Sequence, residues 1–259
     1  MRVLILSDLH HDFWAESGRD PFKGIEELLS SLDHILLAGD LTNKPKVRWK
    51  QAFQDLARHV ALDRVSVFPG NHDFYDFSID REDRLAEIAA SFGVRYVQKK
   101  QVHLGKARLL CATLWTDMAL GAPGLDRIVA RMNDFRKIRV ASRGYGRLRP
   151  ADVTARHRDH VNWLDETLDE RFDGKTFVVT HHAPHPDVLQ DYSDGLDAAY
   201  ASDLSKLINK HHPDGWFFGH SHDANNLTLG RTALQNVSLG YPDEVCDPAR
   251  RIEACIFDL

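Results

Sequence analysis

The segment VLILSDLH, residues 3–10, decides the fold. Its first four residues form a short apolar run typical of a buried strand, and the polar residues Ser7, Asp8 and His10 follow at once or nearly so. The same order of apolar run and polar residues returns at residues 35–40 and 65–73. The intervals between the runs are long enough for helices. The segment therefore predicts the first of several βαβ units in an α/β fold.

Periodicity and capping residues predict the other elements. Asp20 and Pro21 predict the start of a helix through about residue 32, and Pro45 the start of another through about residue 60. Gly93 is suited to cap a helix over residues 79–92. Further helices are expected from Pro150 and at about residues 199–210, and further strands at residues 94–97, 101–104, 108–113, 176–180, 215–218, 227–234 and 252–257, with a hairpin turn at Gly105-Lys106.

Composition and charge limit the class of protein. The 259 residues, 43% of them hydrophobic, can bury a core as one large domain or two small ones, and we expect a single domain over residues 1–259. With 33 basic and 38 acidic residues, the formal charge of −5 argues against general binding of polyanions. Residues 117–149 show no regular hydrophobic period and contain many arginines, so they are interpreted as a basic insertion.

The sequence also bears on location and on the use of cysteine. No apolar run approaches the roughly 20 residues that span a bilayer, and the run at residues 3–6 is too short for a signal peptide. We therefore expect a cytoplasmic protein without a membrane partner. The cysteines Cys111, Cys246 and Cys255 are too few and too unevenly spaced for a disulfide framework or a thiolate zinc site, so reduced thiols are expected.

Five polar motifs follow apolar runs. In an open α/β sheet, residues beyond the carboxyl ends of the strands converge on one crevice, so these motifs are expected to meet. Alternate residues of an extended chain point the same way, which lets Asp8 and His10 share one locus, and likewise His220 and His222. The motifs are SDLH at residues 7–10, GD at 39–40, GNHD at 70–73, THH at 180–182 and GHSH at 219–222.

Together the motifs offer carboxylate, imidazole and amide ligands without thiolate. Such a set suits Mn, Fe or Zn ions and is large enough for two of them. A carboxylate shared by two cations about 3.5–4 Å apart offsets their repulsion, and Asp40 is our candidate for it. A glycine precedes each of Asp40, Asn71 and His220, which fits a backbone that passes close to other elements.

The ordered series DLH, GD, GNHD, THH and GHSH resembles the calcineurin-like metallophosphoesterase superfamily, in particular its small bacterial members. The resemblance implies a four-layer α/β/β/α sandwich with two mixed sheets, helices outside, and metals between the sheets at the strand ends. It further implies a hydroxide that bridges two divalent ions and attacks phosphorus, with manganese favoured over iron or zinc. His72 would act as general acid toward the leaving group. The implied ligands are Asp8, His10, Asp40 and His222 for the first metal, and Asp40, Asn71, His181 and His220 for the second.

Some assignments leave alternatives open. His181 is preferred to His182 as a ligand because it directly follows the apolar run, and a shift of one residue would exchange them. His182 and His185 would then line or support the site. Asp73 either orients His72 or closes the turn.

The basic insertion also has two interpretations, a solvated flap or a cover that faces the substrate. Residues 133–136, NDFR, resemble a segment of bacterial members of the superfamily, and Arg136 could pair with a substrate phosphate. Asn133, Arg136 and His182 are therefore our candidates for contacts with the substrate.

The second motif departs from that of the Ser/Thr protein phosphatases, which continue it as GDxVDRG, whereas this chain has GDLTN at residues 39–43. This favours a hydrolase of small phosphodiesters or phosphomonoesters, the substrates of the small bacterial members. A nuclease would need a longer basic groove, and the net charge counts against nucleic acid. A non-catalytic scaffold would need neither the full ligand set nor His72. The sequence does not indicate an oligomeric state.

Overall fold

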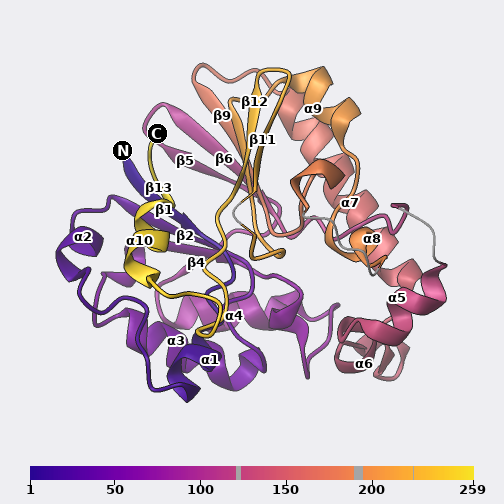
Figure 1. Ribbon diagram of the computed structural model, residues 1–259, viewed down its shortest axis with the longest axis horizontal. Coiled ribbons are helices and arrows are strands. Elements are labelled where there is room, and N and C mark those ends of the chain that lie inside the picture. Colours follow the sequence, from indigo (N-terminus) through magenta and orange to yellow (C-terminus); the bar gives the residue numbers. More distant parts are fainter. Residues whose placement is uncertain (121–123, 190–194, 224) are drawn as a thin grey trace.

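Two β-sheets form the centre of the fold, and helices lie on their outer sides (Figure 1). The structure is a computed structural model that describes residues 1–120, 124–189, 195–223 and 225–259. Both sheets are mixed, and the α/β sandwich predicted from the sequence is confirmed.

The first sheet has the order β13-β1-β2-β3-β4, in which β1 to β4 are parallel and β13 is antiparallel. Its strands are β1 (Arg2–Leu6), β2 (His34–Ala38), β3 (Val65–Phe68), β4 (Arg95–Tyr96) and β13 (Ile256–Asp258). The second has the order β11-β12-β10-β9-β6-β5, with antiparallel strands at both edges. Its strands are β5 (Lys100–Leu104), β6 (Ala107–Ala112), β9 (Lys175–Thr180), β10 (Gly215–Phe218), β11 (Asn226–Leu229) and β12 (Thr232–Asn236).

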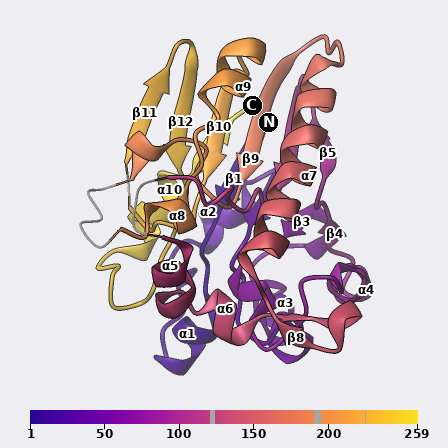
Figure 2. The same cartoon turned by 90° about the vertical axis from the view of Figure 1, so that its right-hand side faces the viewer.

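The alternating direction of side chains along β9 explains how the second sheet packs on both faces. Phe177 and Val179 of β9 belong to the large core that also contains β1, β2 and β3, whereas Val178 between them belongs to a separate cluster. That cluster includes Leu164 of α7 (Pro150–Asp169) and Ile208 of α9 (Ser205–His211), and these two helices cover the outer face (Figure 2). Successive strand residues point to opposite faces, so one apolar strand serves both layers.

The helices are mostly short. Of the outer ones, α3 (Pro45–Leu56) and α4 (Glu82–Ser91) contact each other beside the first sheet, and α7 (Pro150–Asp169) contacts α9 (Ser205–His211). The others are α1 (His11–Glu16), α2 (Glu26–Ser30), α5 (Leu125–Arg131), α6 (Asp134–Lys137), α8 (Asp197–Tyr200) and α10 (Pro248–Glu253). The insertion carries α5, α6 and the two-stranded sheet of β7 (Arg139–Val140) and β8 (Gly146–Arg147). No described helix is both long and apolar enough for a membrane span.

Several boundaries expected from the sequence were wrong. The helix expected over residues 21–32 is reduced to α2, because Asp20 accepts a hydrogen bond from the Phe22 amide in a turn and Gly24 has a φ of +88°. The strand expected at 252–257 is the end of α10 followed by β13. The Asp247 side chain caps α10 and Pro248 occupies its first turn, which is a local signal for a helix.

Three other helices differ in extent from those expected, whereas α7 begins at Pro150 as expected. The helix expected at 199–210 is two helices, α8 and α9, since Ala201 between them forms an isolated β-bridge with Ala183. The helices expected over 45–60 and 79–92 are shorter, although Gly93 takes the left-handed conformation that was predicted to cap the second. The hairpin at Gly105-Lys106 joins β5 to β6 as expected.

Candidate metal centre

All five motifs lie just beyond the carboxyl ends of strands. Those after β1, β2 and β3 come from the first sheet, and those after β9 and β10 from the second. Backbone hydrogen bonds join them, from the Asp8 amide to the Gly39 carbonyl at 3.0 Å and from the Gly219 amide to the His181 carbonyl at 2.9 Å. The motifs therefore meet in space as the sequence predicted.

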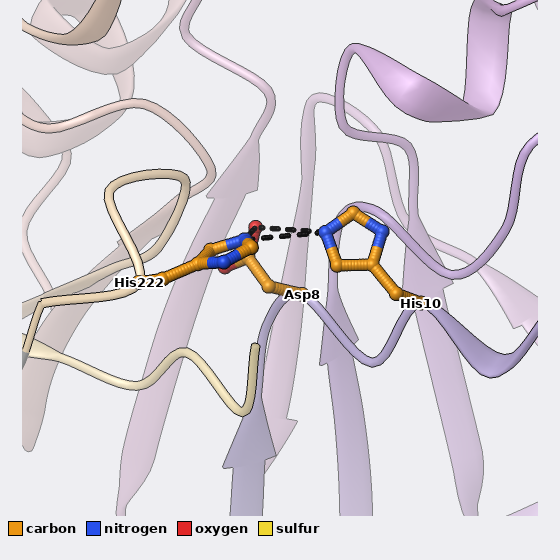
Figure 3. A group of neighbouring side chains, drawn as sticks. All are labelled: Asp8, His10 and His222. Carbon is orange, nitrogen blue, oxygen red and sulfur yellow. Dashed lines mark hydrogen bonds and ion pairs between the residues drawn. The ribbon is translucent and has the colours of Figure 1, made fainter. Parts of the chain in front are cut away.

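Asp8, His10 and His222 form one compact group (Figure 3). Nε2 of His222 lies 3.3 Å from Oδ1 of Asp8, and Nε2 of His10 lies 3.2 Å from Nε2 of His222. Their ligand atoms all lie within 4.8 Å of one another. This spacing suits a single cation held by one carboxylate and two imidazoles.

Asp40 lies between this group and a second one, formed with His181 and His220. Its Oδ1 is 3.4 Å from Nε2 of His181, while its Oδ2 is 3.8 Å from Nε2 of His10. The Asn71 side-chain oxygen lies 3.1 Å from Nε2 of His181. The two oxygens of one carboxylate thus face two groups of candidate ligands.

Some side-chain atoms of the candidate ligands do not face the other ligands. Hydrogen bonds to these atoms orient the side chains. Oδ2 of Asp8 accepts from the His220 amide at 2.9 Å and from the Ser238 hydroxyl at 2.7 Å, which leaves Oδ1 toward His222. Nδ1 of His222 lies 2.7 Å from a carboxylate oxygen of Glu244. A carboxylate on the far nitrogen of an imidazole fixes its tautomer and is common behind metal ligands.

The backbone at the centre is strained. Five candidate ligands have positive φ values, although none is glycine: Asp8, His10, Asp40, His220 and His222. Each such conformation costs on the order of 1 kcal/mol or more, and such residues cluster at functional sites. The packing of both sheets holds the ligands in place against this cost.

The glycines before the ligands are explained by close approach. A Cβ at Gly70 would overlap the side chains of Asp40 and His181, and one at Gly219 would overlap Ser7 and Asp8. The same holds for Gly39 against His181. Only glycine therefore lets these backbone segments pass so close to the ligands, as expected from the sequence.

The buried carboxylates of the centre stabilise positive charge beside them. Burial alone would raise the pKa of Asp40, but His181 and His72 outweigh it and hold that pKa well below its usual range. Burial opposes the charged form of His181 too, yet Asp40 and Asp8 raise its pKa to about 9. Burial and the charge of His181 lower the pKa of His220 to about 3, which keeps this imidazole neutral with a free lone pair.

Two buried atoms at the centre support the fit of a metal. Oδ1 of Asp8 and Nε2 of His220 have no hydrogen-bond partner within the described part of the chain. Unpaired buried polar atoms are costly, and one divalent cation in each group of ligands would give each atom a partner. The residues present therefore fit a metal, and they fit one that takes nitrogen and oxygen ligands.

His72 lies beside the centre and is partly exposed. Its Nε2 is 3.9 Å from Oδ2 of Asp40, and its Nδ1 is 3.1 Å from the side-chain oxygen of Asn43. The ring stacks on Tyr75 with 4.1 Å between centroids. Since Nδ1 donates to Asn43, Nε2 is directed toward Asp40 and the cavity.

The structure shows the contacts of Asp73, His182 and His185, whose roles the sequence left open. The Asp73 carboxylate accepts from the amides of Leu41, Thr42 and Gly70, so it closes the turn rather than bonding the His72 ring. His182 is buried behind His220, with 4.3 Å between ring centroids, and its Nδ1 lies 3.2 Å from the Thr113 carbonyl. His185 accepts from the Asp187 amide in a short turn.

A cavity of about 340 Å³ opens over the centre. Asn133 lines it, whereas Arg136 is exposed and donates to the Asn133 side chain at 2.7 Å. Asp134 between them is buried and accepts from the Asn71 amide group at 3.0 Å and from the Tyr75 hydroxyl at 2.7 Å. The insertion therefore contacts the centre directly, through Asp134. Part of it, residues 121–123, lies outside the described residues.

The motifs did not identify several residues that support the centre. Asn43, Asp134, Ser238 and Glu244 each bond a candidate ligand or His72 from another element. The sequence held a signal only for Asn43, which lies three residues after Asp40 in the second motif, and for Asp134, which lies in the NDFR segment.

The fold and the site define a calcineurin-like phosphoesterase. The sequence model of the calcineurin-like phosphoesterases matches residues 1–224, and the chain belongs to this family. It is a family of metal-dependent phosphoester hydrolases, and the structure places His and Asp groups that could bind metal where the family motifs lie.

Solved structures share the fold at low sequence identity. The chain is similar to the phosphopantetheinyl hydrolase PptH from Mycobacterium tuberculosis, with 20% identity, a TM-score of 0.66, and coverage of 93% of this chain and 90% of that one. It is also similar to the protein TT1561 of Thermus thermophilus, with 16% identity, a TM-score of 0.53, and coverage of 96% and 95%. Among curated proteins, none matches the chain.

Proposed function

We propose that the protein hydrolyses small phosphodiesters or phosphomonoesters with the help of two divalent metal ions. One observation carries the proposal: beneath a cavity of about 340 Å³, Asp40 lies between two groups of candidate ligands, with one oxygen 3.8 Å from His10 and the other 3.4 Å from His181. Asp8, His10, Asp40 and His222 would hold one ion, and Asp40, Asn71, His181 and His220 the other. When bound, such ions supply a hydroxide nucleophile at neutral pH and neutralise charge on the phosphoryl oxygens.

The protein's own side chains would do the rest. His72 would hold a proton on Nε2 and donate it to the leaving oxygen, with Asn43 fixing the ring through Nδ1 at 3.1 Å. Asn133 would contact the substrate from the edge of the cavity. Arg136 and His182, which the sequence also suggested, stay weaker candidates, since neither lines the cavity.

The nitrogen and oxygen ligands without thiolate suit Mn, Fe or Zn, and manganese is the ion we favour among them on the family resemblance. The cytoplasmic location expected from the sequence stays a prediction. The name of the similar M. tuberculosis protein makes phosphopantetheinyl esters one substrate class to test after simple esters.

The first experiment compares hydrolysis of bis(p-nitrophenyl) phosphate and p-nitrophenyl phosphate by metal-stripped protein, with and without added Mn²⁺. Turnover of the diester only with metal would support a phosphodiesterase, and preference for the monoester a phosphatase. Absence of metal-dependent turnover of either ester, in protein that binds Mn²⁺, would count against the proposal and favour a non-catalytic scaffold.

A further inference from the structure

A second cavity, of about 510 Å³, lies beside the metal centre. We call it the basic groove. It is bounded by α3, by residues 76–81, by α4 and by the hairpin of β7 and β8, and Figure 2 shows β8 close to α3 and α4. None of the five sequence motifs contributes to it.

The basic groove shares a wall with the cavity over the metal centre. Tyr75 lines that cavity and stacks on His72, and the next residues, Asp76 and Phe77, line the groove. Lys137 lies at the boundary, because its ammonium group is 4.9 Å from the Tyr75 ring and its carbonyl accepts from the Asp76 amide at 3.2 Å. Three residues of chain reach at most about 10 Å, so the two cavities are adjacent.

The charge of the groove is opposite to that of the whole chain, whose formal charge is −5. The carboxylates among its lining residues are Asp76 and Glu87, and Glu87 is occupied by Arg84 at 2.7 Å. The cations of the lining are Lys46, Lys50, Arg81, Arg84 and Arg139. Within the described ranges, neither Lys50 nor Arg139 has an ion pair with a carboxylate.

An aromatic side chain stands at the edge of the groove. Tyr145 is 64% exposed, and Phe77, which also lines the groove, is buried, with the ammonium group of Lys46 at 5.4 Å from its ring. Lysine and arginine side chains that lack carboxylate partners bind phosphate groups well, arginine with two parallel hydrogen bonds. Cations and an exposed ring together suit a phosphorylated group attached to a planar base.

We propose that the basic groove binds a second phosphate of the substrate, so that the preferred esters carry a phosphate besides the one that is cleaved. This inference rests on the proposed function and narrows it to esters with at least two phosphate groups, as in a nucleoside bisphosphate. Binding energy from such a remote group raises kcat/KM when it positions the reacting phosphate.

The test uses two substrates with the same scissile bond and leaving group. They are thymidine 5′-(p-nitrophenyl phosphate) and the same ester with a 3′-phosphate. We expect the Mn²⁺-loaded protein to favour the 3′-phosphorylated ester in kcat/KM by about tenfold or more at low salt, with the preference shrinking as salt screens the charges. Lys50→Glu and Arg139→Glu should each remove most of this preference. Arg231→Glu is the matched control, because Arg231 is exposed in the turn between β11 and β12, and it should keep the preference.

Equal kcat/KM for the two esters, or a preference that survives both groove substitutions, would overturn the inference while leaving the proposed function intact. If neither diester is turned over, the proposed function is judged by the two p-nitrophenyl esters of the first experiment, and a binding measurement tests the groove. Calorimetry would then compare thymidine 3′,5′-bisphosphate with thymidine 5′-monophosphate. Tighter binding of the bisphosphate that Lys50→Glu removes would support the groove, and equal binding would reject it.

Discussion

Asp40 presents its two carboxylate oxygens to histidines from opposite groups, at 3.4 Å from His181 and 3.8 Å from His10. We predict that Asp40→Asn lowers the occupancy of both metals together, since the amide removes the charge that both would share. Elemental analysis after dialysis against Mn²⁺ measures this. Asp8→Asn is the control, because Asp8 belongs to one group only and should affect mainly one ion. A variant of Asp40 that retains two ions at full affinity would reject the shared role.

His72 is the side chain we expect to protonate the leaving group. We predict that His72→Ala keeps its metal but slows turnover by about 10² to 10⁴ for esters with poor leaving groups. The loss should be smaller for p-nitrophenyl esters, whose leaving group needs no proton. A series of aryl phosphates with rising leaving-group pKa measures the difference, and equal losses along the series would remove His72 from this role.

The sequence predicted the ligand candidates better than it predicted what holds them. Asp8, His10 and the other ligands were found because each sits in a short motif after an apolar run. Glu244 and Ser238 were missed because they bond His222 and Asp8 across 22 and 230 positions of the chain. Such contacts depend on how distant elements pack, and no local pattern records them.

At the scale of elements, the short helix α6 brings Asp134 from the insertion to the metal centre. Its carboxylate accepts from the Asn71 amide group, which turns the Asn71 oxygen toward His181. We predict that Asp134→Ala weakens Mn²⁺ affinity by about 10- to 100-fold, as is usual when a group that orients a ligand is removed. Tyr75→Phe is the comparison, because it leaves the bond between Asp134 and Asn71 in place. Mn²⁺ titration of both variants measures the effect, and equal affinities would contradict it.

A row of polar side chains crosses β2, β3 and β4 in the first sheet. Nε2 of His34 lies 3.1 Å from the Ser66 hydroxyl, and the Arg95 guanidinium lies 3.1 Å from Nδ1. Burial, and then the charge of Arg95, lower the pKa of His34 to about 4, against 6.5 in a free chain. Between these values the unfolded state binds more protons, so the free energy of unfolding rises with pH.

The stability that neutral His34 provides is therefore present above pH 6.5 and is lost as the pH falls toward 4. We predict that the free energy of unfolding falls by about 2 kcal/mol between pH 7 and pH 5 because of His34. His34→Gln should remove most of this loss. Urea unfolding at both pH values measures it. His103→Gln is the control, since His103 is exposed on β5, and the same pH dependence in all three proteins would refute the prediction.

The limits of prediction at this scale come from competing local signals. Asp20-Pro21 was interpreted as the start of a helix, but Gly24 interrupts it with a positive φ. The apolar residues near 252 were interpreted as a strand, although Asp247 and Pro248 are a stronger signal for a helix start. The buried strands of the first sheet were predicted well, because an uninterrupted apolar run bounded by polar motifs admits few alternatives.

On the scale of the whole molecule, the apolar contacts join the two sheets. The main hydrophobic cluster runs from Val3 of β1 through Leu109 of β6 and Val179 of β9 to Cys255 near the last strand. The family resemblance implied this sandwich. The hydrophobic periodicity of the sequence alone did not predict it. We propose that residues 1–259 act as one domain, with the insertion at residues 117–149 as its cover.

The candidate ligands couple metal binding to the stability of this sandwich. Asp8, Asp40 and Asn71 follow strands of the first sheet, whereas His181, His220 and His222 follow strands of the second. A ligand that binds only the folded state adds about 2.7 kcal/mol at 100 times its dissociation constant.

For a chain of this size, that free energy corresponds to a rise in Tm of roughly 5–10 °C. We predict such a rise when Mn²⁺ is added to metal-stripped protein, and reversal by a chelator. Calorimetry of the wild-type protein and of Asp40→Asn measures it, and the variant should show little of the rise. A Tm that does not respond to Mn²⁺ in the wild-type protein would mean that the ligands of the two sheets do not hold an ion between them.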